Sequence, residues 1–209
     1  MPRRNVTKQY APESYYHVYN RGVFGQDVFT SEDDASAFLN QLKKHLSKEP
    51  AKDDVRRTIP HYRKDIELLT YCLMPSHFHL LIYNRNSLGL PRLMHSLMTA
   101  YSLYFNKKHK RRGVLFETSY KASMIHNDAY LWHISRYIHL NPQDIGKNYK
   151  TYPYSSLPFY LGGKRAEWIN PKRILGLHED EKSDYASFVD DYRSVRRDLK
   201  QIEKMLANS

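Results

Sequence analysis

Two apolar segments separated by only two residues constrain the fold of this chain more than any other feature of its sequence. The segments IELLTYCLM (residues 66–74) and HFHLLIYN (residues 77–84) have the length and composition of β-strands, and only Pro75 and Ser76 lie between them. A connection this short joins neighbouring antiparallel strands. The sequence therefore predicts a β-hairpin over residues 66–84.

Helices and further strands are predicted on both sides of the hairpin. Strands are expected at residues 15–22 and 119–126. Capping residues, apolar positions at helical spacing and terminating prolines predict helices at residues 30–50, 90–110 and 128–140, with Thr30 or Ser31 as N-cap of the first and Asn127 as N-cap of the last. This order of elements indicates an α+β fold in which an antiparallel or mixed sheet carries its helices on one face, as in ferredoxin-like and RRM-like folds.

The last part of the chain has a looser pattern. We divide the chain into a main domain over residues 1–165 and a C-terminal helical extension over residues 166–209. Apolar residues of the extension recur at alternating three- and four-residue spacing, at Tyr185, Phe188, Tyr192, Val195, Leu199, Ile202 and Leu206. This stripe fits either a homodimer formed through the C-terminal helix or a helix docked on its own core, and both interpretations stay open.

The composition favours a nucleic acid as partner. The 209 residues include 33 Lys and Arg against 22 Asp and Glu, for a formal net charge of +11, and 18 tyrosines. Cations neutralise phosphates and aromatic rings stack on bases, although charge alone also fits a basic protein without such a partner. No apolar run reaches the roughly 18 residues that a membrane-spanning helix needs, so no membrane partner is expected. The single cysteine, Cys72, fits a reducing cytoplasm.

Positive charge is concentrated in residues 91–126, which contain 7 Lys and Arg and 1 Glu, a net charge of +6. Its segment NKKHKRRG follows a tyrosine-rich predicted helix and precedes a predicted strand. A charge run is usually a solvated loop, but these neighbours favour contact with phosphates. The residues expected to contact nucleic acid are Arg21, Lys107, Lys108, Lys110, Arg111, Arg112, Lys121 and Arg136.

His77 and His79 lie two residues apart in the apolar segment MPSHFHLLI. Residues i and i+2 of a strand project from the same face, so the two imidazoles are expected close enough to share a metal ion. The alternative is a pair of histidines on the solvated face of an edge strand. The apolar surroundings favour the metal site, because an accidental pair falls more naturally in a polar loop.

A third ligand is sought on the predicted helix that ends at Pro142. Tyr137 and Asn141 are four residues apart and therefore lie on one helical face, with His133 one turn earlier. Asn141 precedes proline, which biases it out of helical geometry and leaves the direction of its side chain open.

Five segments of the chain together resemble a known protein family. They are YHVYNRGVFGQDVF, CLMPSHFHLLI, YFNKKHKRRGVLFETSYKA, DAYLWHISRYIHLNP and YPYSSLPFYLG, and they span roughly residues 15–162. In this order they resemble the single-tyrosine HUH transposases, where HUH denotes histidine, hydrophobe, histidine. The closest likeness is to the REP-associated tyrosine transposases.

The resemblance implies a reaction and a set of site residues. It implies that Tyr137 is the nucleophile, that His77 and His79 are metal ligands, and that Asn141 is the third ligand, where relatives carry an amide side chain. The cofactor would be a divalent metal, Mg or Mn, and two imidazoles suit Mn²⁺ better. The partner would be single-stranded or hairpin DNA, cut and rejoined through a 5′-phosphotyrosine intermediate. We expect such a protein in the cytoplasm, associated with the nucleoid.

Two rival functions fit the sequence less well. A two-histidine phosphodiesterase acting on RNA would need His-x-Thr or His-x-Ser pairs in two halves, and this chain has one histidine pair. The second rival is a non-catalytic hairpin DNA-binding or regulatory protein derived from a transposase. The presence of both histidines and Tyr137 argues against such decay without disproving it.

Overall fold

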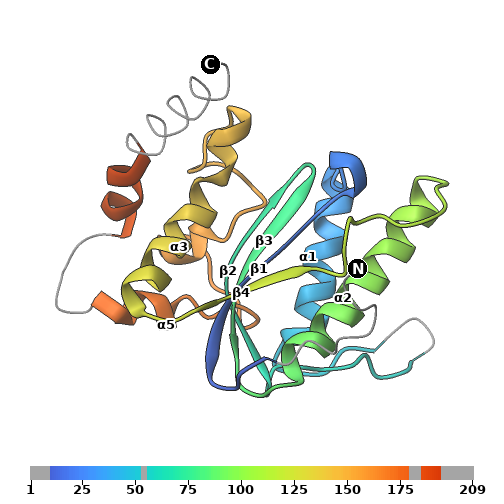
Figure 1. The fold of residues 1–209 in the computed structure, drawn as a ribbon, viewed down its shortest axis with the longest axis horizontal. Coiled ribbons are helices and arrows are strands. Elements are labelled where there is room, and N and C mark those ends of the chain that lie inside the picture. Colours follow the sequence, from blue (N-terminus) through green and yellow to red (C-terminus); the bar gives the residue numbers. More distant parts are fainter. Residues whose placement is uncertain (1–9, 53–55, 179–184, 194–209) are drawn as a thin grey trace, which may run out of the picture.

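A four-stranded antiparallel sheet runs through the middle of the molecule, with helices on both sides of it (Figure 1). This computed structural model describes residues 10–52, 56–178 and 185–193. The strand order is β2-β3-β1-β4, formed by β1 (Ser14–Arg21), β2 (Ile66–Met74), β3 (His77–Asn84) and β4 (Lys121–Ile125). The predicted hairpin is confirmed, because β2 and β3 pair antiparallel on either side of a two-residue turn.

The central strand β3 is buried on both faces of the sheet. Every residue of β3 after His77 is buried. Because side chains alternate, Phe78 and Leu80 enter one apolar core while Leu81 and Tyr83 enter another on the opposite face. Both faces of the sheet therefore need a covering layer.

The first face is covered by two long helices, α1 (Glu32–Leu46) and α2 (Gly89–Lys108). Ser31 is the N-cap of α1, one of the two predicted, and its hydroxyl accepts a hydrogen bond from the Asp34 amide at 3.4 Å. Phe38 of α1 is fully buried, with ring centroids 5.0 Å from Phe78 and 5.1 Å from Tyr101. Aromatic packing thus joins α1, α2 and β3.

The second face is covered by α3 (Asp128–Leu140). Asn127 caps this helix as predicted, since its side chain accepts a hydrogen bond from the Tyr130 amide at 2.7 Å. The predicted α+β class and antiparallel sheet are confirmed, but the helices are divided between two faces instead of lying on one. The reason is that β2 and β3 are apolar on both faces, so a single helical layer would leave half of that surface in water.

Short helical turns connect these elements. They are η1 (Val23–Gly25), η2 (Asn141–Ile145), α4 (Leu157–Tyr160), α5 (Lys172–Leu175) and η3 (Gly176–His178). Asn141 was expected to leave helical geometry before Pro142, yet it keeps φ −52° and ψ −37°. Pro142 lies in the first two positions of the next turn, η2, where its missing N–H is tolerated.

Residues 185–193 form a helix that packs against α3 (Figure 1). The Tyr185 ring is buried, and its hydroxyl hydrogen-bonds with Ser135 Oγ at 2.8 Å and His139 Nδ1 at 2.9 Å. The described start of the apolar stripe therefore docks on the chain's own core. The rest of the stripe, at Val195, Leu199, Ile202 and Leu206, lies outside the described residues. None of the described helices is long and apolar enough to cross a bilayer.

The buried His139 makes stability depend on pH. Complete burial lowers the pKa of His139 to about 3, against about 6.5 in an unfolded chain. Its ring therefore stays neutral in the folded protein while the unfolded chain takes up a proton, so the stabilising contribution is present above pH 6.5 and is lost as the pH falls. Between pH 6.5 and pH 5 we expect this group to lower the free energy of unfolding by roughly 1 to 2 kcal/mol.

A His139→Gln variant isolates this effect in urea unfolding experiments at several pH values. The variant should be less stable than the wild type at neutral pH, because it disturbs the hydrogen bonds to Tyr185 and Ser156. The difference between the two proteins should narrow toward pH 5. A difference that is the same at both pH values would contradict the assignment.

Candidate active site

Three histidines from two neighbouring strands form a cluster on the α3 side of the sheet. His77 and His79 leave the same face of β3, and their ring centroids are 5.1 Å apart with planes nearly perpendicular. His17 of β1 lies beside them, with its Nε2 atom 2.9 Å from His79 Nδ1. We call His17, His77 and His79 the histidine cluster.

Tyr137 of α3 stands over this cluster. Its ring centroid is 5.9 Å from that of His79 and 6.3 Å from that of His17, and both contacts are edge-on. Helix α3 crosses the same face of the sheet, so its covering role in the core also brings the tyrosine to the histidines. The fold thus brings Tyr137 beside His79, one of the two histidines singled out from the sequence.

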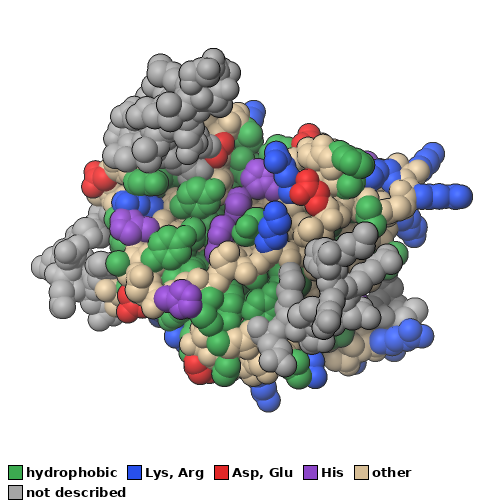
Figure 2. Space-filling model, in the orientation of Figure 1, with side chains coloured by type: hydrophobic (Ala, Val, Ile, Leu, Met, Phe, Trp, Pro, Cys, Tyr) green, Lys and Arg blue, Asp and Glu red, His purple; other side chains and the backbone are tan. Residues whose placement is uncertain are grey.

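An open pocket of about 680 Å³ lies at this contact. Figure 2 shows histidine side chains near the middle of this face, with apolar side chains to one side and Lys or Arg side chains to the other. The residues that line the pocket are His17, Tyr19, His79, Ser123, Tyr130, His133, Ile134, Arg136, Tyr137 and Tyr192. The pocket combines imidazoles, phenols and a guanidinium, which suits a phosphate group and a metal ion.

Burial favours the uncharged form of His17. Desolvation lowers the pKa of His17 to about 4, and His79 is 8% exposed. A neutral imidazole keeps the lone pair that a metal ligand needs. The environment of the cluster therefore fits ligation better than ion pairing.

Two of the predicted metal ligands, Asn141 and His77, do not line this pocket. Asn141 is buried, and its side-chain amide donates a hydrogen bond to the Ile138 carbonyl oxygen at 3.3 Å. No group of three or more His, Cys, Asp or Glu side chains in the described part of the chain is arranged to hold a metal ion.

A family model decides which group of proteins this chain is part of. The family described as IS200-like transposase matches residues 34–141, about half of the chain. The chain belongs to the IS200-like transposase family. The matched residues run from the first turn of α1 to the end of α3 and include His77, His79 and Tyr137.

One solved structure supports the fold of this IS200-like transposase. The chain is similar to a REP-associated tyrosine transposase bound to a REP hairpin, with 12% sequence identity, 80% of this chain and 92% of that chain covered, and a TM-score of 0.54. A second structure, described as a transposase from Deinococcus radiodurans R1, matches with 17% identity, 64% and 95% coverage and a TM-score of 0.39. No curated protein matches the chain. The predicted family resemblance is confirmed.

The histidine His17 was missed by sequence reasoning. It lies in YYHVY, which was predicted as a strand, but nothing in that segment says which strand it pairs with. In the transposase, β1 pairs with β3, and Tyr19 is the register partner of His79. The available signal was that His17 alternates with Tyr15 and Tyr19 and so shares one face of the predicted strand with them. Its proximity to His79 follows only from the pairing of β1 with β3.

Three of the predicted DNA-binding cations lie on the histidine face of the transposase. Arg21 is exposed and is the register partner of His77. The Lys121 Nζ atom of β4 lies 5.9 Å from the Tyr19 ring centroid. Arg136 lines the pocket and is stacked between two rings of the C-terminal helix, with 4.2 Å from its guanidinium carbon to each centroid. Burial lowers the pKa of Arg136 from its ordinary value.

The other predicted cations lie at the end of α2 and in the loop that follows. Lys107, Lys110 and Arg112 are exposed. Arg111 donates a hydrogen bond to Gln26 Oε1 at 3.1 Å. Lys108 donates to three oxygens near the start of α1, which gives it a structural role in addition to any contact with DNA.

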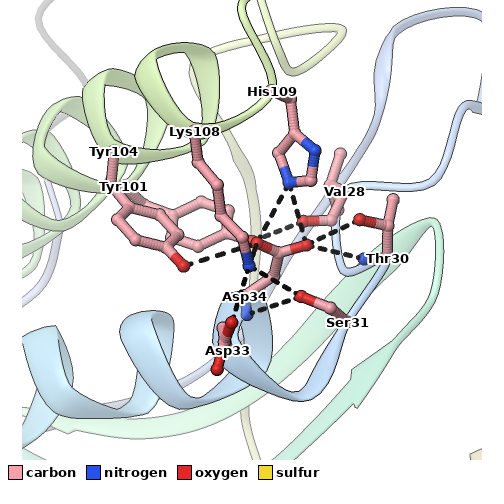
Figure 3. A network of polar contacts seen from close by, with 9 residues as sticks. All are labelled: Val28, Thr30, Ser31, Asp33, Asp34, Tyr101, Tyr104, Lys108 and His109. Atoms are coloured by element: carbon pink, nitrogen blue, oxygen red, sulfur yellow. Dashed lines mark hydrogen bonds and ion pairs between the residues drawn. The ribbon is translucent and has the colours of Figure 1, made fainter.

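The network around Lys108 centres on the fully buried carboxylate of Asp34 (Figure 3). Its oxygens accept hydrogen bonds from the Thr30 amide and hydroxyl, from Lys108 Nζ at 2.9 Å and from His109 Nε2 at 3.1 Å. Burial would raise the pKa of Asp34, but the hydrogen bonds from Thr30, Lys108 and His109 outweigh it and hold the pKa well below its usual range. The network ties the end of α2 to the start of α1.

Replacing this carboxylate should destabilise the fold. We expect Asp34→Asn to lower the free energy of unfolding by about 3 kcal/mol at pH 7, because the partners of a buried charge lose their counter-charge. Since the folded pKa is depressed, the difference from the wild type should shrink as the pH falls below about 4. The matched control is Asp33→Asn, whose side chain is 81% exposed and whose effect should stay under about 0.5 kcal/mol. Equal losses in the two variants, measured by urea unfolding, would contradict this role.

Proposed function

We propose that this protein cuts and rejoins single-stranded DNA, with Tyr137 as nucleophile and a divalent metal ion held by His77, His79 and Asn141. The observation that carries the proposal is the position of Tyr137, edge-on to His79 at 5.9 Å in one open pocket. The likeness in fold to a transposase bound to a hairpin supports hairpin-forming DNA as the substrate.

The donor atoms fit the proposed cofactor. The imidazoles of His77 and His79 leave one face of a strand with their ring centroids 5.1 Å apart, so both could be ligands of one ion. An amide oxygen from Asn141 would complete a set suited to Mn²⁺ or Mg²⁺. When bound, such an ion would polarise the scissile phosphate and stabilise the departing oxygen.

His17 would fix the orientation of His79. A histidine that ligates through Nε2 carries its proton on Nδ1, and His79 Nδ1 is 2.9 Å from His17 Nε2. The bond then runs from His79 Nδ1–H to His17 Nε2, so His17 must be the neutral Nδ1-protonated tautomer. Outer partners of this kind set both the ring orientation and the basicity of a ligand.

Tyr137 would form the covalent intermediate. Its phenol oxygen attacks phosphorus and loses its proton, the bond from phosphorus to the 3′-oxygen breaks, and that oxygen is released as a hydroxyl. The product is a 5′-phosphotyrosine, and attack by a second 3′-hydroxyl reverses the step and releases the tyrosine. The Arg136 guanidinium beside Tyr137 would neutralise charge on the phosphate oxygens.

The DNA would lie across the histidine face and the end of α2. The residues proposed to contact it are Arg21, Lys107, Lys108, Lys110, Arg111, Arg112, Lys121 and Arg136. Such contacts release counterions and make affinity fall with added salt. A protein that acts on DNA in this way would work in the cytoplasm, beside the nucleoid.

Tyr137→Phe tests the nucleophile directly. The variant keeps the ring but lacks the oxygen that forms the bond, so covalent adduct with end-labelled hairpin DNA and Mn²⁺ should fall to background on a denaturing gel. Tyr130→Phe is the matched control, because Tyr130 belongs to the same helix and lines the same pocket. An adduct that survives Tyr137→Phe rules out this nucleophile, and a wild type that binds hairpins without forming adduct favours the regulatory alternative.

Two substitutions of His17 test its positioning role. His17→Phe removes the acceptor and should weaken Mn²⁺ binding, measured by calorimetry without DNA, by about 10- to 100-fold. His17→Gln retains an oxygen that can accept from His79 and should keep most of that affinity. Wild-type affinity in His17→Phe would contradict the assignment, and so would an equal loss in the two variants when both remain folded by circular dichroism.

A further inference from the structure

Phe24 combines two unfavourable features on the surface of the protein. Its side chain is 99% exposed, the highest value among the large hydrophobic side chains of the described residues. Its backbone is left-handed, with φ 55° and ψ 25°, a conformation that residues other than glycine rarely adopt. The exposed ring is not packed against the rest of the chain to offset this backbone strain. Backbone outliers of this kind concentrate at ligand-binding positions.

The backbone that carries Phe24 is held firmly. The Gly22 amide donates to the Ser76 carbonyl at 2.8 Å and the Val23 amide donates to the Leu115 carbonyl at 3.0 Å. A Cβ atom on Gly22 would lie 2.2 Å from the Gln26 carbonyl oxygen, so this close approach requires glycine. The turn η1 is therefore fixed between the β2–β3 hairpin and the segment after α2, and it presents the ring to solvent from a rigid base.

The turn lies next to the proposed catalytic site. Arg21 immediately precedes it and is the register partner of His77. On the other side, Gln26 accepts a hydrogen bond from Arg111. Two exposed carboxylates lie nearby. Asp27 follows Gln26 in the chain, and the Glu117 amide donates a hydrogen bond to the Arg21 carbonyl oxygen, so the turn has acidic as well as basic neighbours. An exposed aromatic ring on a fixed turn, with Arg21 before it in the chain and Arg111 bonded to Gln26 after it, matches the platforms that bind single-stranded DNA, where rings stack on bases and cations contact phosphates.

We propose that Phe24 stacks on an unpaired base of the DNA, in the single-stranded segment that flanks the hairpin. The inference rests on the proposed function in one respect, because it takes single-stranded DNA as the ligand. It requires neither cleavage nor a metal ion. A base has two apolar faces and fits an exposed ring with cationic neighbours better than an apolar protein surface does.

The test compares two fluorescent hairpins, one with randomised single-stranded flanks and one trimmed to a blunt end. Binding is measured by anisotropy at fixed salt, without metal, in a Tyr137→Phe background so that no DNA is cut. Phe24→Ala should lower the affinity for the flanked hairpin by about 10-fold and leave that for the blunt hairpin unchanged. Phe24→Trp should retain the affinity. The matched control is Leu103→Ala, a residue that is 68% exposed and should have no effect.

Several outcomes would overturn the proposal. Unchanged affinity in Phe24→Ala, or an equal loss for both hairpins, excludes stacking on a flanking base. A change in oligomeric state on light scattering would show that a second copy of the chain covers the ring instead. If the wild type cuts no DNA but Phe24→Ala still loses affinity selectively, the proposed function fails and this inference stands. If no DNA binds at all, both fail.

Discussion

The alternation of side chains along β3 determines both the core and the site. Phe78 is buried in the core beneath α1 and α2, and its neighbours His77 and His79 point to the opposite face. A shift of one residue in the pairing of this strand would exchange the two sets. The apolar contacts that fix the register of β3 therefore also fix where the histidines lie. The positions of the site residues thus depend on the packing of the core.

The second helical layer brings Tyr137, the proposed nucleophile, to the histidine cluster. Tyr137 reaches the histidines because α3 covers the apolar residues of β2 and β3 on that face. The helix is held in turn by Tyr185, through hydrogen bonds to Ser135 and His139. Residues outside the pocket thus set the distance between the proposed nucleophile and the proposed ligands, a dependence on supporting contacts that is common in enzymes.

Local signals in the sequence predicted most of the helices and strands, whereas contacts between distant segments could not be predicted from the sequence. The two-residue link between β2 and β3, the helical spacing in α2 and the cap at Asn127 act within a few residues, and each was found. The second helical layer and His17 depend on which strands and helices meet in space. Lys108 illustrates the same limit, because a lysine bound to Asp34 and one in solvent look alike in a charge run.

The contact between His17 and His79 joins two positions that are 62 residues apart in the chain. Because a single shared proton must be donated by one ring and accepted by the other, neither residue can change its hydrogen-bonding character independently. The residues at these two positions should therefore change together among members of the family. Where a relative lacks a histidine at the position of His17, another acceptor should have appeared nearby, and sequence covariation would record that exchange.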